Sequence, residues 1–202
     1  DVSRDNLMRQ SIELISKFPA IIAYAYNMYR HKHHGRSLHI RDAHPGFSLA
    51  ENFLYMLKGG DYSELDARTL DLLLILHSEH GGGNNSTFTV RVTSSTGTDT
   101  YSSIAAGIGS LKGPKHGGAN LKVCDMLSFL KSEIKDWQND DEIATAVKRM
   151  LDGKLFDHSG LVYGIGHAVY TMSDPRCEIL KECTKKLAKE KGKLDEFELY
   201  ET

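Results

Sequence analysis

Along most of this chain, apolar side chains recur at the roughly three-to-four-residue spacing of amphipathic helices. Between residues 7 and 30 they stand at Leu7, Ile12, Ile15, Ile21, Ile22, Ala25 and Met28. Pro19 lies inside this run. Because proline has no amide hydrogen and clashes with the preceding turn, we expect a bend or a break in the helix there. The polar, histidine-rich segment 31–45 is predicted to be a loop.

Further helices are predicted at 48–57, 63–76, 99–111, 116–135, 141–151 and 174–191, the last of which closes the series. Gly59 and Gly60 end the first of them. Ser63 begins the second, since a hydroxyl cap followed by carboxylates suits a helix N-terminus. Segment 99–111 is rich in small residues, which predicts a buried, closely packed helix. Pro175 suits a first helical turn, where its missing amide hydrogen would have no helical partner.

Segment 87–95 is the one place where local preference and the wider pattern disagree. Its residues alternate and are rich in β-branched side chains, so propensity alone favours a strand. No second good strand is available to pair with it, and we therefore expect a helix and an all-α fold. The turn dipeptide Gly113-Pro114 predicts a domain boundary between residues 113 and 114.

Composition narrows the class of protein. The 202 residues, of which 40% are hydrophobic, suit one or two globular domains with a buried core. A net charge of −2 does not point to a nucleic-acid partner. No apolar run approaches the roughly 18 residues of a membrane span. Three cysteines without a CxxC pair fit a reducing cytoplasm better than a disulfide scaffold.

Three short segments place a histidine beside glycines. They are the segments around His80 (His-Gly-Gly-Gly-Asn-Asn), around His116 (Gly-Pro-Lys-His-Gly-Gly-Ala-Asn) and around His167 (Tyr-Gly-Ile-Gly-His-Ala-Val-Tyr), the last followed by Ser-Asp-Pro-Arg176. Backbone without Cβ atoms lets a ligand approach both the imidazole and the amides. His116 is predicted to open a helix, where the dipole favours a neutral imidazole that can hydrogen-bond to an enolate-like oxygen.

Plainer interpretations of these residues compete with the functional one. A single histidine beside glycine is more often a cap or a turn residue, and Gly164-Ile165-Gly166 alone is weak support for nucleotide binding. The tract 31–34 lacks the spaced second ligand pair of a zinc site, so we predict a solvated loop and no metal. His77, one turn before His80, is predicted to support the site or the core rather than contact a ligand.

Together and in this order, the segments resemble the citrate synthase family over essentially the whole chain. The resemblance implies a multihelical fold in which 1–113 is part of a large domain and 114–202 part of a small one. It also implies a cytoplasmic, homodimeric acyltransferase of the tricarboxylic acid cycle. Such an enzyme condenses its substrates acetyl-CoA and oxaloacetate, with water, to give citrate and CoA, and it needs no cofactor, nucleic acid or membrane.

By position, the resemblance also implies a role for each site residue. His80 and His167 contact oxaloacetate, and Arg176 pairs with one of its carboxylates, as a planar guanidinium does well. His116 and His167 are the catalytic histidines: His116 stabilises the enol of acetyl-CoA, and His167 polarises the ketone that the enol attacks. The loop that accepts part of coenzyme A consists of Tyr163, Gly164, Ile165 and Gly166.

The chain departs from the family pattern in two respects. The family's base is an aspartate downstream of the last helix predicted here, accompanied by two further arginines, and Asp195 does not have its sequence context. We therefore expect an internal fragment that is inactive alone and that exposes apolar helix faces. Thr171 stands where many relatives have a lysine or arginine for the coenzyme's phosphates; Lys112 and Lys115 are the candidates to replace it.

Two alternatives stay open. A 2-methylcitrate synthase would use propionyl-CoA, and one methylene is worth only about 1–3 kcal/mol of discrimination in an apolar pocket. The second alternative is a non-catalytic helical module that binds CoA or a partner protein, for which His80, His116 and His167 would be dispensable.

Overall fold

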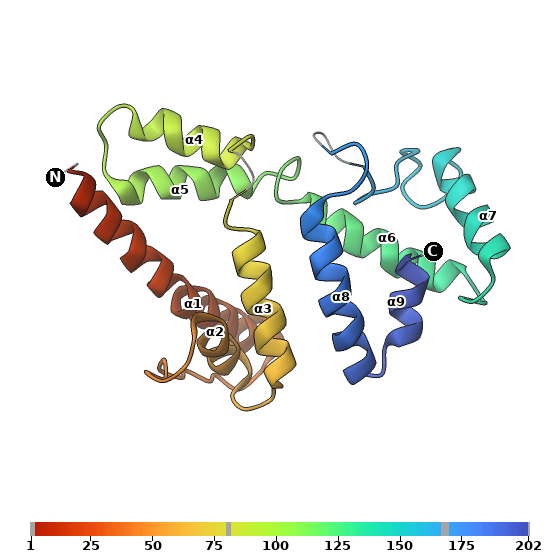
Figure 1. Ribbon diagram of the computed structural model, residues 1–202, viewed down its shortest axis with the longest axis horizontal. Helices are drawn as coiled ribbons and strands as arrows, with labels where there is room; N and C mark the ends of the chain where they lie inside the picture. Colours follow the sequence, from red (N-terminus) through yellow and green to blue (C-terminus); the bar gives the residue numbers. More distant parts are fainter. Residues whose placement is uncertain (1–2, 80–81, 167–169, 202) are drawn as a thin grey trace. The chain divides into compact units, whose positions relative to one another are not determined.

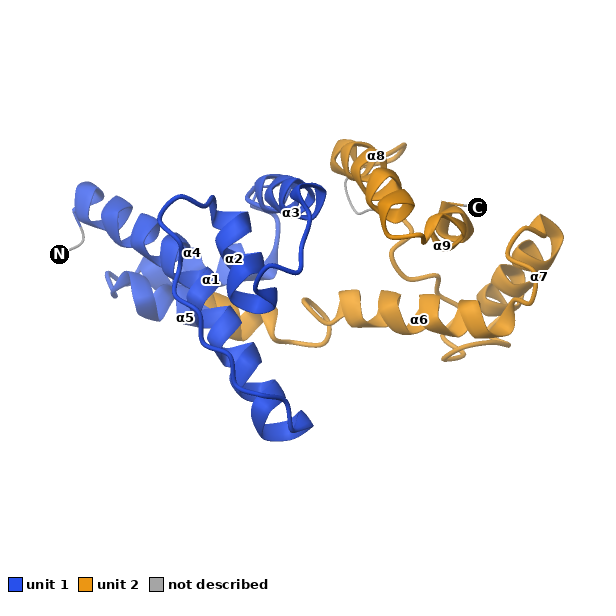
Figure 2. Ribbon diagram, turned by 90° about the horizontal axis from the view of Figure 1, so that it is seen from below, with its two compact units in different colours: residues 1–106 blue, residues 107–202 orange. Residues whose placement is uncertain are grey.

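The computed structural model of the chain describes residues 3–79, 82–166 and 170–201. Within these ranges the chain forms nine α-helices and no strand, which confirms the all-α class (Figure 1). Contacts between residues divide it into two compact units, residues 1–106 and residues 107–202 (Figure 2). The assignment of 1–113 and 114–202 to a large and a small domain stays a prediction.

The first unit is organised around three consecutive helices. Helix α1 (Arg4–His34) packs on α2 (Leu49–Lys58), and α2 packs on α3 (Glu64–Leu76). Small side chains and one methionine form the buried core of this unit: Ala23, Ala50, Met56 and Ala67. An apolar groove of about 230 Å³ runs between the same three helices. Helices α4 (Asn85–Ser94) and α5 (Thr100–Leu111) follow along the chain.

Local capping sets where α2 and α3 begin. The Ser48 hydroxyl accepts a hydrogen bond from the Glu51 amide at 3.2 Å, and the Glu51 carboxylate accepts one from the Ser48 amide at 2.7 Å. Ser63 and Asp66 repeat this reciprocal pair at 3.1 and 2.8 Å. Each pair satisfies two amides that the helix leaves without partners. Both predicted helix starts are therefore confirmed.

Helix α1 differs from its prediction at two points. It continues through Pro19, so of the predicted bend or break the break is wrong; the proline is buried beside Ile15 and Phe18, where packing offsets the lost hydrogen bond. The loop predicted from residue 31 begins only after His34. The rings of His33 and His34 lie 4.8 and 5.3 Å from that of Tyr29, which extends the helix by a further turn.

Two further predictions for this part of the chain have opposite outcomes. Segment 85–94 is helical, as expected against its strand propensity. The segment rich in small residues is also a helix, α5, but its predicted burial is wrong for Ala105 and Gly109, which are exposed; Ser103 and Gly107 are buried.

The second unit has a compact core where three helices and two connecting segments meet. Ile134, Ile143, Ala146 and Leu199 are buried together, and Leu130, Trp137, Val147 and Leu155 pack against them. They come from α6 (Ala119–Glu133), α7 (Asp140–Leu151) and α9 (Leu194–Glu201) and from the segments that follow α6 and α7. Helix α8 (Pro175–Glu190) packs on α9; Asp174 caps it, and Pro175 lies in its first turn as predicted.

Helix α9 was not predicted. It has eight residues and no strong amphipathic pattern, and tertiary contacts fix it in place. Leu199 enters the core, Lys131 of α6 pairs with Glu196 at 2.8 Å, and Lys181 of α8 pairs with Glu201. Such contacts stabilise a helix too short to form alone.

The surface of the described residues carries many apolar side chains. On α1, Ile12, Ile15, Ile21 and Met28 are all about half exposed, as expected for helix faces that lack a covering partner. Among the described helices, none combines the length and the apolar character that crossing a bilayer requires.

Replacing Ile143 with alanine tests the core of the second unit. Because Ile143 is 6% exposed and lies at the centre of the cluster, Ile143→Ala should lower the free energy of unfolding by about 2–5 kcal/mol. Leu151→Ala on the same helix is the matched control, since Leu151 is 56% exposed and should cost no more than about 0.5 kcal/mol. Urea unfolding followed by the fluorescence of Trp137, the single tryptophan of the chain, measures both. Equal losses of unfolding free energy in the two variants would contradict the placement of Ile143 in a buried core.

Candidate functional site

His116 lies in a tight turn directly before α6. Its amide donates a hydrogen bond to the Gly113 carbonyl at 3.0 Å, and the Gly117 amide donates one to the Leu111 carbonyl, also at 3.0 Å. The predicted helix start at His116 is wrong, because α6 begins at Ala119. The half-buried His116 is therefore held by the turn and not by the first turn of the helix.

The two glycines after His116 are required by close backbone approach. A Cβ atom at Gly118 would lie 2.5 Å from the Pro114 carbonyl oxygen, and one at Gly117 would overlap the Leu111 carbonyl. Real Cβ atoms do not come that close to backbone, so any other residue would push the turn open. The Gly117-Gly118 pair thus has a structural reason: it lets the chain fold back on itself and fixes the backbone of His116.

The predicted coenzyme loop, Tyr163 to Gly166, is anchored on α6. The Tyr163 amide donates to the Met126 sulfur at 3.3 Å. Gly164 has a φ of 84°, and a Cβ there would lie 3.1 Å from a methyl group of Val123, so both conformation and space favour glycine. Ile165 next to it is 78% exposed. The loop therefore presents its backbone and one apolar side chain to the surroundings.

The phenol of Tyr163 is held by Asp157, a residue that no sequence motif indicated. The Tyr163 hydroxyl donates to the Asp157 carboxylate at 2.7 Å, and the Lys122 ammonium lies 3.2 Å from the same oxygen. Lys122 also lies within 6 Å of the ring centres of Phe156 and Tyr163. Hydrogen bonds from Ser159 and Tyr163, and then from Lys122, hold the pKa of Asp157 well below its ordinary value.

The backbone beside Asp157 is strained. Phe156 and His158 have φ values of 57° and 59°, a left-handed conformation that costs non-glycine residues on the order of 1–3 kcal/mol each. The Phe156 ring packs against Phe129 of α6 and against Tyr163. One sequence signal could have indicated the contacts around Asp157. Lys122, Met126 and Phe129 share a face of α6 at helical spacing.

Arg176 lies in the first turn of α8 and is bound by the residue that caps this helix. Asp174 accepts hydrogen bonds from the Arg176 amide at 2.9 Å, from Nε at 3.0 Å and from Nη2 at 2.6 Å. The hydrogen bond to Asp174 raises the pKa of the Arg176 guanidinium further above its ordinary value. Asp174 occupies the Nε–Nη2 edge, and among the described residues no second carboxylate pairs with the Nη1–Nη2 edge.

His80 and His167 lie outside the described residues, so the predicted convergence of His80, His116, His167 and Arg176 stays a prediction. Helix α1 includes the histidine tract 31–34 as its last turn. In the part of the chain that the structure describes, no group of three histidine, cysteine, aspartate or glutamate side chains is placed to hold a metal ion.

Comparison with known proteins decides the family. A sequence profile described as "Citrate synthase, C-terminal domain" matches residues 2–202. The chain belongs to the citrate synthase family. The "Citrate synthase" of Deinococcus radiodurans is 42% identical over 154 residues, which cover 75% of this chain and 37% of that protein. The "2-methylcitrate synthase" of Shewanella oneidensis is 37% identical, over 89% of this chain and 43% of that protein.

A solved structure of the citrate synthase family agrees with the fold. The ternary complex of carboxymethyl coenzyme A and oxaloacetate with citrate synthase from Thermoplasma acidophilum matches with a TM-score of 0.76 and 29% identity. The match covers 98% of this chain and 47% of that one. The all-α, citrate-synthase-like fold is thereby confirmed. The chain spans less than half the length of the two curated relatives.

Replacing Asp157 with asparagine tests whether this carboxylate holds the predicted coenzyme loop. Asp157→Asn keeps an acceptor for Tyr163 but loses the charge and the Lys122 pair, so the amides of residues 160–166 should exchange with solvent faster. Hydrogen exchange resolved by mass spectrometry measures this. Asp152→Asn, which removes an exposed carboxylate paired with Lys154, is the control and should leave that segment unchanged.

The hydrogen bond between Asp157 and Tyr163 should also make the protection of the loop 163–166 depend on pH. Because the folded-state pKa of Asp157 lies below its ordinary value of about 3.9, its stabilising effect is complete at neutral pH and declines as the pH falls below that value. Loop protection that is equally weakened by acid in the wild-type and Asp157→Asn chains would contradict this role.

Proposed function

We propose that this chain is part of a citrate synthase, which condenses acetyl-CoA with oxaloacetate and water to form citrate and CoA. One observation carries the proposal. This chain, a member of the family, has His80, His116, His167 and Arg176, each within its complete motif and in the family's order. The rigid turn at His116 and the carboxylate-bound Arg176 support it.

His116 is proposed to act on the thioester. When a carboxylate base removes a proton from the methyl group of acetyl-CoA, negative charge develops on the thioester oxygen. An imidazole N–H of His116 donates a hydrogen bond to that oxygen and stabilises the enol, as donors in an oxyanion hole do. Such a donor must already be in place, and the backbone contacts of Gly117 and Gly118 supply that rigidity.

His80, His167 and Arg176 are proposed to bind oxaloacetate. The Nη1–Nη2 edge of Arg176 pairs with one carboxylate of the substrate, while His80 and His167 hydrogen-bond to the rest of it. The enol carbon then forms a bond to the ketone carbon, and His167 donates a proton to the ketone oxygen. Hydrolysis of the resulting citryl thioester by water releases citrate and CoA.

Residues 163–166 are proposed to receive part of coenzyme A. Met126 holds the Tyr163 amide and Asp157 holds the Tyr163 hydroxyl, which anchors the loop from one side. Lys112 and Lys115, both exposed, are proposed to take the phosphate contact that Thr171 cannot make. We further propose that the full-length protein is a cytoplasmic homodimer of the tricarboxylic acid cycle.

The first test concerns the 202-residue chain alone. Incubated with acetyl-CoA and oxaloacetate, it should release no CoA thiol above the uncatalysed rate, because the family's base and two arginines are not among its residues. Loss of a general base typically costs about 10²–10⁴ in rate. Detection of free thiol with a chromogenic disulfide measures the outcome. Sustained turnover would show that the base is within this chain and has been misplaced.

The second test uses a longer protein that includes this chain and is active. His116→Gln should lower kcat by about 10²–10³, with a much smaller change in the KM for oxaloacetate, since the lost hydrogen bond forms mainly in the transition state. His33→Gln, on the exposed last turn of α1, is the control. Unchanged kcat in the His116 variant would favour the non-catalytic module.

A 2-methylcitrate synthase is the second candidate, favoured by one observation: the Shewanella oneidensis enzyme of that name is 37% identical to this chain. The two candidates share every residue role above and differ only in the pocket for the acyl group. The ratio of kcat/KM for propionyl-CoA to that for acetyl-CoA, measured on the same active protein, decides between them.

A further inference from the structure

Asp157 lies in a strained segment between α7 and the loop 163–166. Its neighbours Phe156 and His158 both have left-handed backbone conformations. Non-glycine residues hold such a conformation only where surrounding contacts enforce it, and they gather at functional sites. The His158 ring nitrogen Nδ1 lies 3.0 Å from the Gly153 carbonyl oxygen, which closes the segment on itself. The strain therefore indicates that the placement of Asp157 has a functional purpose.

Each oxygen of the Asp157 carboxylate has a partner within the same unit. The Ser159 amide donates to Oδ1 at 3.1 Å. Oδ2 accepts hydrogen bonds from the Tyr163 hydroxyl at 2.7 Å and from the Lys122 ammonium at 3.2 Å. These three donors come from the segment itself, from the loop and from α6, so the carboxylate joins all three parts of the chain.

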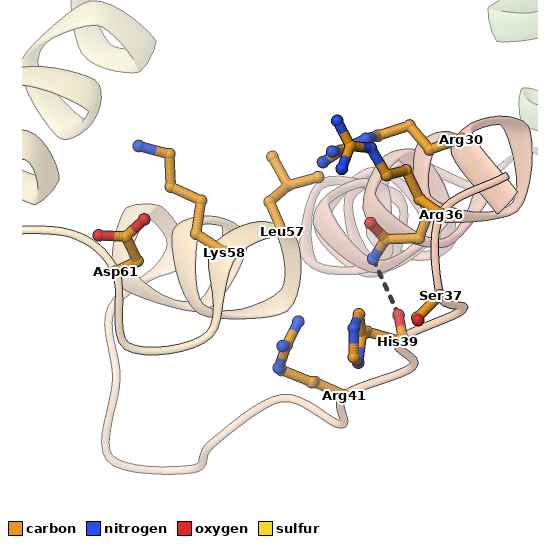
Figure 3. A pocket seen from close by; sticks show the side chains of 9 residues that line it. Arg30, Arg36, Ser37, His39, Arg41, Leu57, Lys58 and Asp61 are labelled. Atoms are coloured by element: carbon orange, nitrogen blue, oxygen red, sulfur yellow. Dashed lines mark hydrogen bonds between the residues drawn. The ribbon is translucent and has the colours of Figure 1, made fainter. Parts of the chain in front are cut away.

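Lys122 is engaged by the protein itself, unlike some cations of the first unit. Figure 3 shows Arg30, Arg36 and Lys58 around a basic pocket of that unit. Within the described residues, no carboxylate lies at ion-pairing distance from any of these three. The Lys122 ammonium instead pairs with Asp157. Because this pair balances its charge, Lys122 attracts a further anion less strongly and is suited to hold the carboxylate in place.

Helix α6 holds the loop 163–166 from a second direction. The Met126 sulfur accepts a hydrogen bond from the Tyr163 amide at 3.3 Å, and a Cβ at Gly164 would lie 3.1 Å from a methyl group of Val123. The amide and the hydroxyl of Tyr163 therefore both have partners inside the protein. The first residue of the loop is thus an anchor, and the residues after it follow from a fixed starting point.

We propose that Asp157 is a positioning residue for acetyl-CoA. Acting through the Tyr163 hydroxyl, it holds the loop 163–166 in the conformation that receives the coenzyme. This role rests on the proposed function of the loop and adds one assignment to it: the Tyr163 hydroxyl serves as an anchor to the protein and is not a ligand of the coenzyme. A loop that is ordered before binding lowers the cost of binding.

The predicted effect is confined to one substrate. In a longer, active protein that contains this chain, Asp157→Ala should raise the KM for acetyl-CoA about tenfold, since a charge-assisted hydrogen bond to the loop is lost. The kcat and the KM for oxaloacetate should stay within about twofold of wild type, because the loop does not contact oxaloacetate in the proposed reaction. Asp157→Asn keeps an acceptor for Tyr163 and should have a smaller effect on the KM for acetyl-CoA.

A double-mutant cycle separates positioning through Tyr163 from a direct contact with the coenzyme. Tyr163→Phe removes the hydroxyl and keeps the ring, so it should raise the KM for acetyl-CoA about as much as Asp157→Ala. If Asp157 acts through Tyr163, the double variant should be no worse than either single variant. Two effects that multiply in the double variant would show independent roles and overturn the proposal.

Binding without turnover distinguishes a failure of this proposal from a failure of the proposed function. Titration calorimetry with CoA in the presence of oxaloacetate, with which CoA does not react, measures it. Asp157→Ala should bind CoA about tenfold more weakly than wild type, and the control Asp152→Asn should bind within about twofold, since it removes only an exposed carboxylate paired with Lys154.

Wild-type binding of CoA that Asp157→Ala leaves unchanged would overturn the positioning role alone. A wild-type protein that binds no CoA would overturn the proposed function and the positioning role with it. Circular dichroism verifies that each variant keeps its helix content. If Asp157→Ala does not fold, Asp157→Asn and Tyr163→Phe form the cycle, and an unchanged KM for acetyl-CoA in both would overturn the proposal.

Discussion

Backbone packing at Gly117 and Gly118 is the constraint on which the described part of the candidate site depends. Because the chain folds back on Leu111 and Pro114 with no room for a side chain, the turn before α6 has little freedom. This turn fixes where α6 begins and where His116 lies. The same helix then supports the loop 163–166 through Val123 and Met126. One short element thus holds two of the predicted functional segments.

Two carboxylates, of which only Asp174 lies within a motif, hold the other functional groups in place. Asp157 binds the Tyr163 hydroxyl, and Asp174 binds the side edge of Arg176. In both cases a charge-assisted hydrogen bond fixes a side chain or loop that the proposed reaction needs, which is how supporting residues give a site its precision.

What the sequence could predict follows from how local each interaction is. The starts of α2 and α3 were predictable because Ser48 and Ser63 pair with residues three positions ahead. The end of α1, the helical path through Pro19 and the existence of α9 depend on ring packing, groove burial and ion pairs with distant residues. Sequence periodicity does not contain such information. The strand-like segment 85–94 was predicted correctly only because no pairing partner existed.

The same distinction applies to the site. His80, His116, His167 and Arg176 could be predicted as site residues because each lies in a compact motif; the family is confirmed, and their roles stay predictions. Asp157 and Lys122 lie 35 positions apart and meet only through folding.

The central claim is that three imidazoles and one guanidinium converge on oxaloacetate. A crystal structure of a longer, active protein containing this chain, with oxaloacetate bound, tests it most directly. The account predicts His80, His167 and Arg176 within hydrogen-bond distance of the ligand and the His116 ring facing its ketone carbon across the space for a thioester. Oxaloacetate bound elsewhere, or these four side chains on separate surfaces, would contradict it.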